Sequence, residues 1–275
     1  FVKRTKESYL GMEGCMLSVV IPSLGGDLCD TLDSVNAGSI CPDEIIVCLP
    51  NDTHSVKDVL KYKNLTILYA EQYGQVYQRI VGFKYAKGDY VLQIDDDVLL
   101  DRGCLEKLIA SLKKLPESST VSPCLFNTNG KPQYEGKKDG LLSIYYRLIN
   151  GETGHKSGGI TLAGTNFGVN PNDFNSDVVR VDWQPGGCVL HKKENLILKG
   201  FYPNKGKAYC EDLIHSFLLK ELGIDLFVDT RARCIARLNP RLSLLKEIVP
   251  DFKIRLYFVK MAKLSVIRML IHYIV

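Results

Sequence analysis

The sequence lacks the features that mark zinc proteins, secreted proteins and repeat proteins. Its 275 residues include nine cysteines but no C-x-x-C pair, and zinc sites are usually built on such pairs. Cys188 and His191 form a lone C-x-x-H, but residues three apart in a strand face opposite sides, so we expect no metal site there. There is no low-complexity tract, no internal repeat and no secretory signal. Unpaired cysteines without a signal fit a reducing compartment, so we expect a cytoplasmic protein.

The net charge of +4 is concentrated in one segment. Residues 241–275 contain seven Lys and Arg against two acidic residues, whereas the rest of the chain has 28 basic and 29 acidic residues. We therefore expect no nucleic-acid partner for the body of the protein, and we expect the tail to contact an anionic surface.

Apolar runs alternate with helical patterns in the first half of the chain. The runs are rich in β-branched residues and predict buried strands at 17–22 and 44–50 and further strands at 65–70 and 90–95. Amphipathic patterns predict helices at 27–37, 53–62, 75–86 and 104–115. This alternation indicates an α/β fold with a mostly parallel sheet covered on both faces. In such sheets, ligands bind at the carboxyl ends of the strands.

The second half is less regular. Residues 127–180 are rich in Gly, Asn, Lys and Asp and predict only one helix, near 140–149. Regular patterns return at 181–193, with a helix predicted at 210–222 and a strand at 225–229. We interpret the chain as a leader (1–15), one catalytic domain (16–240) and a helical tail (241–275).

Three aspartates follow the predicted strand at 90–95 directly. Adjacent carboxylates repel one another, so they stay together only beside a cation or in a solvated turn. Asp95 and Asp97 point to the same side of an extended segment, and paired carboxylate oxygens suit Mg²⁺ or Mn²⁺. The position of the triplet at a strand end favours the metal site over a solvated acidic turn.

Two further segments carry polar or backbone features suited to a ligand. Glu211 and Asp212 begin a predicted helix, where acids either stabilise the helix dipole or supply a general base. The segment WQPGG (183–187) contains the only tryptophan, and its glycines allow backbone to approach a ligand closely. Trp183 is either a core residue or an aromatic platform beside a sugar or diphosphate.

Taken together, these pieces resemble the family-2 glycosyltransferases of the GT-A fold over residues 17–237. The resemblance is carried by SVVIPS, DEIIV, QRIVGFKYAKGDYVLQIDDD and the block from WQPGG to KELG. It implies a GT-A type Rossmann-like sheet and inverting transfer of one sugar from a nucleotide sugar, with Mn²⁺ or Mg²⁺ as cofactor. We expect this transfer to serve the assembly of a bacterial-type surface glycan, such as lipopolysaccharide or capsule.

The resemblance also implies roles for the nucleotide side of the site. Asp97, with Asp95, would hold the divalent cation, and Asp95 or Asp96 would contact the ribose or the metal. Pro22 and Ser23 would line the nucleotide cleft, and Arg79 would lie near the nucleotide. Many relatives end the second strand with an aspartate that recognises the base. Leu49 occupies that place here, so Asp52 becomes the candidate, and a UDP-sugar is the favoured donor.

On the acceptor side, the resemblance implies that Asp212 is the catalytic base with Glu211 beside it. Trp183, Gly186 and Gly187 would border the acceptor, a glycan or a lipid-linked sugar. The R-x-x-R-W signature of processive synthases is absent, which favours single-sugar transfer. Relatives often have a histidine where Arg237 stands, so we expect no histidine contact with the metal.

Two other functions remain open for this sequence. A sugar-phosphate nucleotidylyltransferase would use a similar sheet, but its first strand would lead into a basic, Gly-rich loop. PSLGGDLCD has neither Lys nor Arg. A non-catalytic binding module of the same fold would have no need for both acidic segments.

The tail combines apolar residues with frequent positive charge. Five basic residues interrupt residues 251–275, too many for a transmembrane span. On a single helical wheel Lys253, Lys260, Lys263 and Arg268 share one broad face, whereas Arg255 does not. We expect peripheral contact with the cytoplasmic face of a membrane. The alternative is a helix packed on the catalytic domain or on another subunit.

Overall fold

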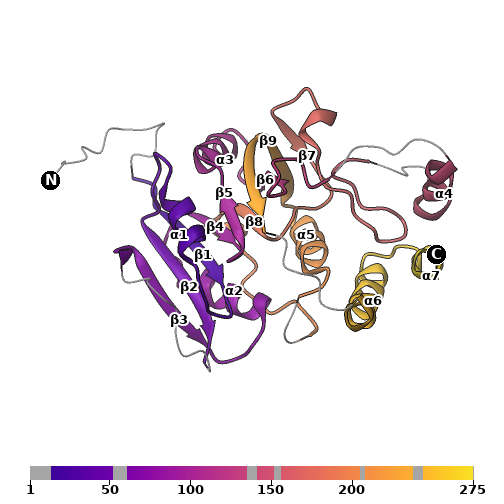
Figure 1. Ribbon diagram of the computed structural model, residues 1–275, viewed down its shortest axis with the longest axis horizontal. Helices are drawn as coiled ribbons and strands as arrows, with labels where there is room; N and C mark the ends of the chain where they lie inside the picture. The colour runs from indigo at the N-terminus through magenta and orange to yellow at the C-terminus, as the bar shows by residue number, and fades with distance from the viewer. Residues whose placement is uncertain are drawn as a thin grey trace.

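One mixed sheet organises the protein. The computed structural model describes residues 14–51, 61–134, 141–151, 156–204, 208–237 and 244–274. Within these ranges the strand order is β3-β2-β1-β4-β8-β6-β9-β5, and β7 pairs with β9 (Figure 1). The expected α/β fold with a mostly parallel sheet flanked by helices is thereby confirmed.

The first half of the sheet is parallel. It consists of β3 (Leu65–Ala70), β2 (Glu44–Pro50), β1 (Leu17–Pro22) and β4 (Tyr90–Ile94). All six residues of β1 are buried. Val19 and Ile21 join the core on one face, and Val20 joins a second core with Phe83 on the other. A strand buried on both faces must be apolar throughout, which explains why sequence patterns located β1, β2 and β4. Strand β3 lies at the edge of the sheet and is mostly half-buried.

The predicted helices of this half are also present. They are α1 (Cys29–Asn36), α2 (Gln75–Tyr85) and α3 (Cys104–Leu112). Helix α2 lies directly on β1, because a Cβ added at Gly82 would meet Val20 at 2.4 Å. The helix predicted at 53–62 falls almost entirely outside the described residues.

The second half of the sheet is mixed. Strand β8 (Cys188–Lys192) runs antiparallel to β4 and to β6 (Ser119–Phe126), whereas β9 (Asp225–Ala236) runs parallel to β6. Two short strands, β5 (Val98–Leu100) and β7 (Val178–Arg180), add antiparallel to β9. The helices of this half are α4 (Leu141–Asn150) and α5 (Glu211–Glu221), close to their predicted ranges, and single 3₁₀ turns occur at η2 (Pro171–Asp173) and η3 (Lys193–Asn195).

Strand β6 was not predicted, although all eight of its residues are buried. Its sequence, STVSPCLF, mixes polar residues and a proline with apolar ones. Thr120 is accommodated because its hydroxyl donates to Gln184 Oε1 at 2.8 Å. Pro123 lies where the register with β9 shifts, at an irregularity that tolerates the missing N–H. The buried location therefore follows from contacts that local pattern does not encode.

The tail consists of two helices, whereas the helical wheel above treats residues 251–275 as one helix. They are α6 (Leu244–Met261) and α7 (Val266–Ile274), and Lys263 between them has φ +54°. Ile254, Phe258, Val259 and Met269 pack with Trp183, Leu213 and Ile214 in one core. The tail therefore packs on the catalytic domain through these side chains, and other side chains of α7 are exposed. None of the helices in the described ranges has the length and apolar character needed to cross a membrane.

Candidate active site

The aspartate triplet forms the turn between β4 and β5. Three backbone hydrogen bonds fix this turn. Val98 N donates to Asp95 O at 3.2 Å within the turn. Asp95 N donates to Gly187 O at 2.9 Å, and Arg237 N donates to Asp97 O at 3.0 Å. The turn therefore connects the parallel half of the sheet with β5, the WQPGG segment and the end of β9.

Arg79 joins the two acidic segments. It lies on α2, is 2% exposed, and donates from Nη2 to Asp95 Oδ1 at 2.8 Å and from Nη1 to Glu211 Oε1. Arg79 and Glu211 are 132 residues apart in the sequence. Burial lowers the pKa of Arg79, but the carboxylates of Glu211 and Asp95 outweigh it and leave the pKa raised. The arginine is thus a fixed positive charge between the aspartate turn and the start of α5.

Ser23 ties the end of β1 to the turn. Its hydroxyl donates to Asp96 Oδ2 at 2.5 Å and accepts from Gly25 N at 3.0 Å. Two residues that sequence reasoning missed complete this corner. Thr31 Oγ1 donates to Asp96 O at 2.8 Å, and the buried Gln78 amide donates to the carbonyls of Ser23 and Cys48, both at 2.7 Å. Thr31 lies outside the quoted motifs, whereas Gln78 is the first residue of QRIVGFKYAKGDYVLQIDDD and stands next to Arg79 on α2, but no role was assigned to it.

The electrostatics of the turn suit a cation. Burial, reinforced by Asp95 and Asp96, raises the pKa of Asp97 to about 6. Burial also raises the pKa of Asp96. A cation beside these oxygens would favour the charged carboxylates. The described residues contain no group of three or more metal-ligating side chains. A donor set of Asp97 with Asp95 still fits Mg²⁺ or Mn²⁺, which commonly take one or two carboxylates plus phosphate and water.

The WQPGG segment lies between the turn and α5. Gln93 Nε2 donates to Gly186 O at 2.5 Å. A Cβ added at Gly186 would lie 2.6 Å from Glu211 Oε2, and one at Gly187 would lie 3.4 Å from Asp95 Oδ2. These glycines permit close approach to the two carboxylates that Arg79 bridges. They also place backbone beside the predicted base.

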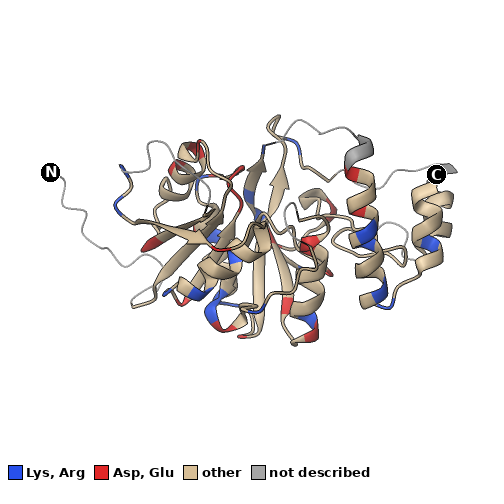
Figure 2. Ribbon diagram, turned by 90° about the horizontal axis from the view of Figure 1, so that it is seen from below, with Lys and Arg blue, Asp and Glu red and all other residues tan. Residues whose placement is uncertain are grey.

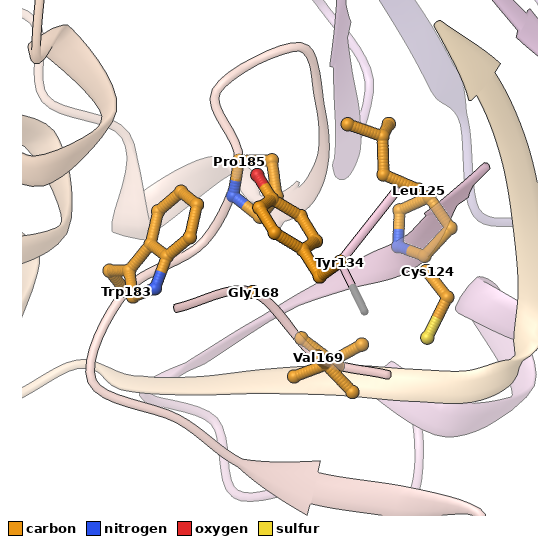
Figure 3. Close-up of a pocket in the computed structure, with 9 residues that line it drawn as sticks. Cys124, Leu125, Tyr134, Gly168, Val169, Trp183 and Pro185 are labelled. Carbon is orange, nitrogen blue, oxygen red and sulfur yellow. The ribbon is translucent and has the colours of Figure 1, made fainter. Parts of the chain in front are cut away.

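Trp183 belongs to the core in this structure. It is 1% exposed, its indole N–H donates to Phe167 O at 2.9 Å, and Tyr134 meets it edge to face with ring centroids 5.9 Å apart. Figure 3 shows the two rings side by side in a small pocket that is also lined by Pro185 and Gly168. Trp183 offers no open face to a sugar. Its packing fixes the start of the WQPGG segment instead.

Glu211 and Asp212 begin α5, after Cys210 with φ +50°. Burial raises the pKa of Glu211 to about 7, although Arg79 opposes this effect. Burial raises the pKa of Asp212 to about 6. Asp212 is half-buried and accepts the N–H of Leu213 at 2.9 Å. Of the two acids, Glu211 is paired with Arg79, whereas Asp212 accepts a hydrogen bond from the backbone of Leu213.

Two buried histidines lie behind this arrangement. His191 is beside Gln93, with Nε2 3.3 Å from Gln93 Oε1, and its ring meets that of His215 at 5.7 Å. Burial lowers the pKa of His191 to about 3, so the ring is neutral at pH 7. Cys188 packs in the core on the opposite face of β8, as its spacing from His191 predicted.

Pro22, Asp52 and Arg237 are the remaining predicted positions. Pro22 is buried at the end of β1, next to Ser23. Asp52 lies outside the described residues. Arg237 follows β9, and its guanidinium is paired with Asp30.

Similarity to solved structures supports the architecture. A structure entitled GalNAc-T7 with UDP, GalNAc and Mn²⁺ matches with a TM-score of 0.60 at 19% identity, covering 87% of this chain and 48% of that one. S. aureus TarS 1–349 in complex with UDP matches with a TM-score of 0.55 at 16% identity, covering 92% and 68%. TarS with UDP-GlcNAc matches at 0.52 and 16%, covering 92% and 69%. This chain thus spans about half of the GalNAc-T7 structure. At these identities the matches show the fold alone.

Sequence comparison identifies the family. No curated protein sequence matches the chain. The family model described as Glycosyl transferase family 2 matches residues 18–166, more than half of the 275 residues. The match includes the parallel strands, Ser23, Arg79 and the aspartate turn. The chain therefore belongs to glycosyl transferase family 2.

Proposed function

We propose that this enzyme transfers a single sugar from a nucleoside-diphosphate sugar to an acceptor hydroxyl, with inversion and with a divalent cation. One observation carries the proposal: buried Arg79 contacts both Asp95 and Glu211 and so brings the aspartate turn beside the start of α5. A donor-binding side and a candidate base thereby belong to one centre.

The donor nucleotide would bind at the carboxyl ends of β1 and β4. Pro22, Ser23 and Asp96 would line its cleft, with Asp96 fixed by the Ser23 hydroxyl. Asp52 stays a proposed contact for the nucleobase. A UDP-sugar is the favoured donor, which is supported by the UDP in the similar GalNAc-T7 and TarS structures.

Asp97 and Asp95 would hold Mn²⁺ or Mg²⁺. When bound, the ion supplies Lewis-acid stabilisation of the negative charge on the departing nucleoside diphosphate. Arg79 contributes a fixed positive charge next to Asp95 and pairs with one of its carboxylate oxygens.

Asp212 would act as the general base. A carboxylate oxygen of Asp212 takes the proton of the acceptor hydroxyl while the hydroxyl oxygen bonds to the anomeric carbon. The bond from that carbon to the diphosphate oxygen breaks, and its electron pair leaves with the nucleotide. Attack opposite the leaving group inverts the anomeric carbon. Glu211 would position Asp212 through its ion pair with Arg79.

The acceptor would approach along Gly186 and Gly187, which lie against Glu211 and Asp95. We place the enzyme in the assembly of a bacterial-type surface glycan, on a glycan or lipid-linked acceptor at the cytoplasmic face of a membrane. The basic tail supports such a location, because enzyme and acceptor would then share one surface.

A donor panel tests the proposal. The protein is incubated with UDP-, GDP- and dTDP-sugars and Mn²⁺, and free nucleoside diphosphate is measured with and without a lipid-phosphate-linked sugar acceptor. We expect release from at least one donor, stimulated by acceptor. Pyrophosphate release from a nucleoside triphosphate and a sugar phosphate would instead identify a nucleotidylyltransferase. Donor binding with no turnover on any acceptor would identify a binding module.

A further inference from the structure

Helix α7 presents an apolar stripe to solvent. Ile267, Leu270, Ile271 and Ile274 are 72%, 40%, 42% and 83% exposed. Their spacing of three and four residues places them on one face of the helix. Met269 is fully buried against α6 and the core, so the helix is already anchored by a different face. The exposed stripe is therefore available for another contact.

Helix α4 extends this surface, although it comes from a distant part of the chain. Ile144 and Leu148, one turn apart, are 58% and 72% exposed. Helices α4 and α7 contact each other. The backbone of Leu162 links them, because its carbonyl accepts from Ser265 N at 2.8 Å, just before α7, and its N–H donates to Asn150 O at 3.2 Å, at the end of α4.

We name the six exposed apolar side chains of these two helices the α4–α7 face. It lies at the end of the molecule opposite β3 (Figure 1). Such clustering marks an interaction surface, since isolated apolar residues are ordinary on protein surfaces.

The exposed charges around this face are of one sign. Among the described side chains of α4, α6, α7 and the turn after α6, the exposed charged ones are Arg147, Lys253, Lys260 and Lys263, and the acidic Glu247 is half-buried. The acidic Asp251 is half-buried and paired with Arg255. Figure 2 shows the basic residues of the two C-terminal helices as blue segments. On α6, Lys253 and Lys260 share their helix face with the exposed Tyr257. Apolar side chains flanked by lysines match the boundary between anionic headgroups and acyl chains.

We propose that the α4–α7 face docks the enzyme on an anionic lipid surface. The inference deepens the membrane contact of the proposed function and specifies its location. The apolar side chains enter the headgroup boundary, and the lysines of α6 and of the turn after it contact lipid phosphates. A lipid surface demands no matching hydrogen-bond pattern, which suits a stripe without polar groups.

Contacts of α6 connect this surface with the active site. Cys210 Sγ lies 3.5 Å from Asp251 Oδ1, and Cys210 directly precedes Glu211 and Asp212. Arg255 Nη1 donates to Gly164 O at 2.7 Å, and Arg255 Nε donates to Tyr273 Oη on α7 at 3.1 Å. Docking through α4 and α7 would hold the proposed base at a fixed height above the lipid. An acceptor sugar on a lipid phosphate would be presented at that height.

Deleting the tail would not test the proposal, because α6 and α7 form part of the core. The test uses a stripe variant, Ile267→Gln/Ile271→Gln/Ile274→Gln, since glutamine retains helix propensity. Its matched control replaces exposed apolar residues elsewhere: Tyr85→Gln/Leu198→Gln/Leu222→Gln, at positions 47%, 43% and 67% exposed. A charge variant, Lys253→Glu/Lys260→Glu/Lys263→Glu, is paired with Lys84→Glu/Lys114→Glu/Lys199→Glu. Circular dichroism and thermal melting verify that each variant is folded.

Co-sedimentation with vesicles of phosphatidylcholine, with or without 30% phosphatidylglycerol, is the measurement. We expect wild type to bind the anionic vesicles only, and added salt to weaken binding. The stripe variant should lose at least about tenfold in partitioning, since apolar insertion supplies much of it. The charge variant should lose at least about fivefold for each lysine, because each change removes a positive charge and adds a negative one, and both controls should stay within about twofold.

Two results would overturn the inference. One is equal partitioning of wild type and stripe variant. The other is a wild-type dimer in analytical ultracentrifugation that the stripe variant converts to a monomer, with no vesicle binding; the face would then join two copies of the chain. Neither result depends on sugar transfer, because no donor is present in these assays. Failure of the docking proposal is therefore distinguishable from failure of the proposed enzyme activity.

Discussion

The two halves of the sheet build their sides of the proposed active site differently. On the donor side, four parallel strands and α2 follow one another closely in the chain, and Ser23, Arg79 and Asp95–Asp97 stand at or near their ends. On the acceptor side, the WQPGG segment leads directly into antiparallel β8, but residues 193–210 separate β8 from α5, and a long, mostly irregular stretch separates β6 from the WQPGG segment. The donor side is thus a product of local pattern, whereas the acceptor side depends on distant contacts.

Arg79 is where the two sides meet. It belongs to the donor side by sequence, yet it contacts Glu211 of the acceptor side as well as Asp95. Removing one partner from a buried ion network leaves an uncompensated charge, which is costly. We therefore expect some substitutions to affect donor binding, some to affect sugar transfer, and some to affect both.

The largest expected effect is on the acceptor side. Asp212→Asn removes the proposed base, and transfer should fall by about 10²–10⁴, the usual contribution of a positioned base. Donor binding, measured by calorimetry with the nucleotide sugar, should stay within about threefold because the donor side is intact. The exposed Asp173→Asn is the matched control and should have wild-type activity. Transfer within about threefold of wild type in Asp212→Asn would show that another group is the base.

Metal removal should act from the donor side. EDTA or Asp97→Asn should reduce turnover by at least about a hundredfold, because the ion contributes several kcal/mol of charge stabilisation in such reactions. The protein should remain folded by circular dichroism, since Asp97 lies in a turn and not in the core. Restoration by Mn²⁺ after chelation provides the control. Undiminished turnover in EDTA would remove the cation from the mechanism.

A pH profile of kcat/KM should sharpen the assignment of the base. Burial raises the pKa of Asp212 to about 6, and the protonated carboxyl cannot accept a proton. Activity should therefore be constant above this pKa and fall about tenfold per pH unit below it, whereas an ordinary aspartate would stay active to about pH 4. Donor affinity measured at each pH separates changes on the donor side. A rate that is flat down to pH 5 would exclude Asp212 with this pKa as the base.

The smallest expected effect concerns the hydrogen bond between Ser23, at the end of β1, and Asp96. Ser23→Ala removes the hydroxyl that donates to Asp96 Oδ2 at 2.5 Å. A hydrogen bond to a charged group contributes about 1.5–3 kcal/mol, so donor KM should rise by about tenfold or more. The chemical step should change less, which pre-steady-state measurements resolve. Ser39→Ala, which removes a hydrogen bond to Glu106 away from the site, serves as control. A change in kcat alone would place Ser23 in transfer and not in donor binding.

Sequence patterns located the strands and acids but not their partners. The buried strands of the donor side are apolar at nearly every position, and the acids stand at a strand end and a helix start, where local pattern is informative. Nothing in the sequence joins Arg79 to Glu211, because that contact is made only in the folded sheet. Strand β6 escaped prediction because Pro123 and its polar neighbours break the apolar pattern. The burial of Trp183 likewise depends on Phe167 and Tyr134, which local sequence does not place beside it.

The most direct test of the account is a double-mutant cycle between Arg79 and Glu211. Arg79→Met, Glu211→Gln and the double variant are compared with wild type in free energy of unfolding and in kcat/KM. We expect each single change to destabilise the fold by about 3–5 kcal/mol, and the double variant to lose at least about 1 kcal/mol less than the sum. The same non-additivity should appear in kcat/KM if Arg79 joins both sides into one centre. Additivity within about 0.5 kcal/mol in both quantities would contradict the account, because donor and acceptor sides would then be independent.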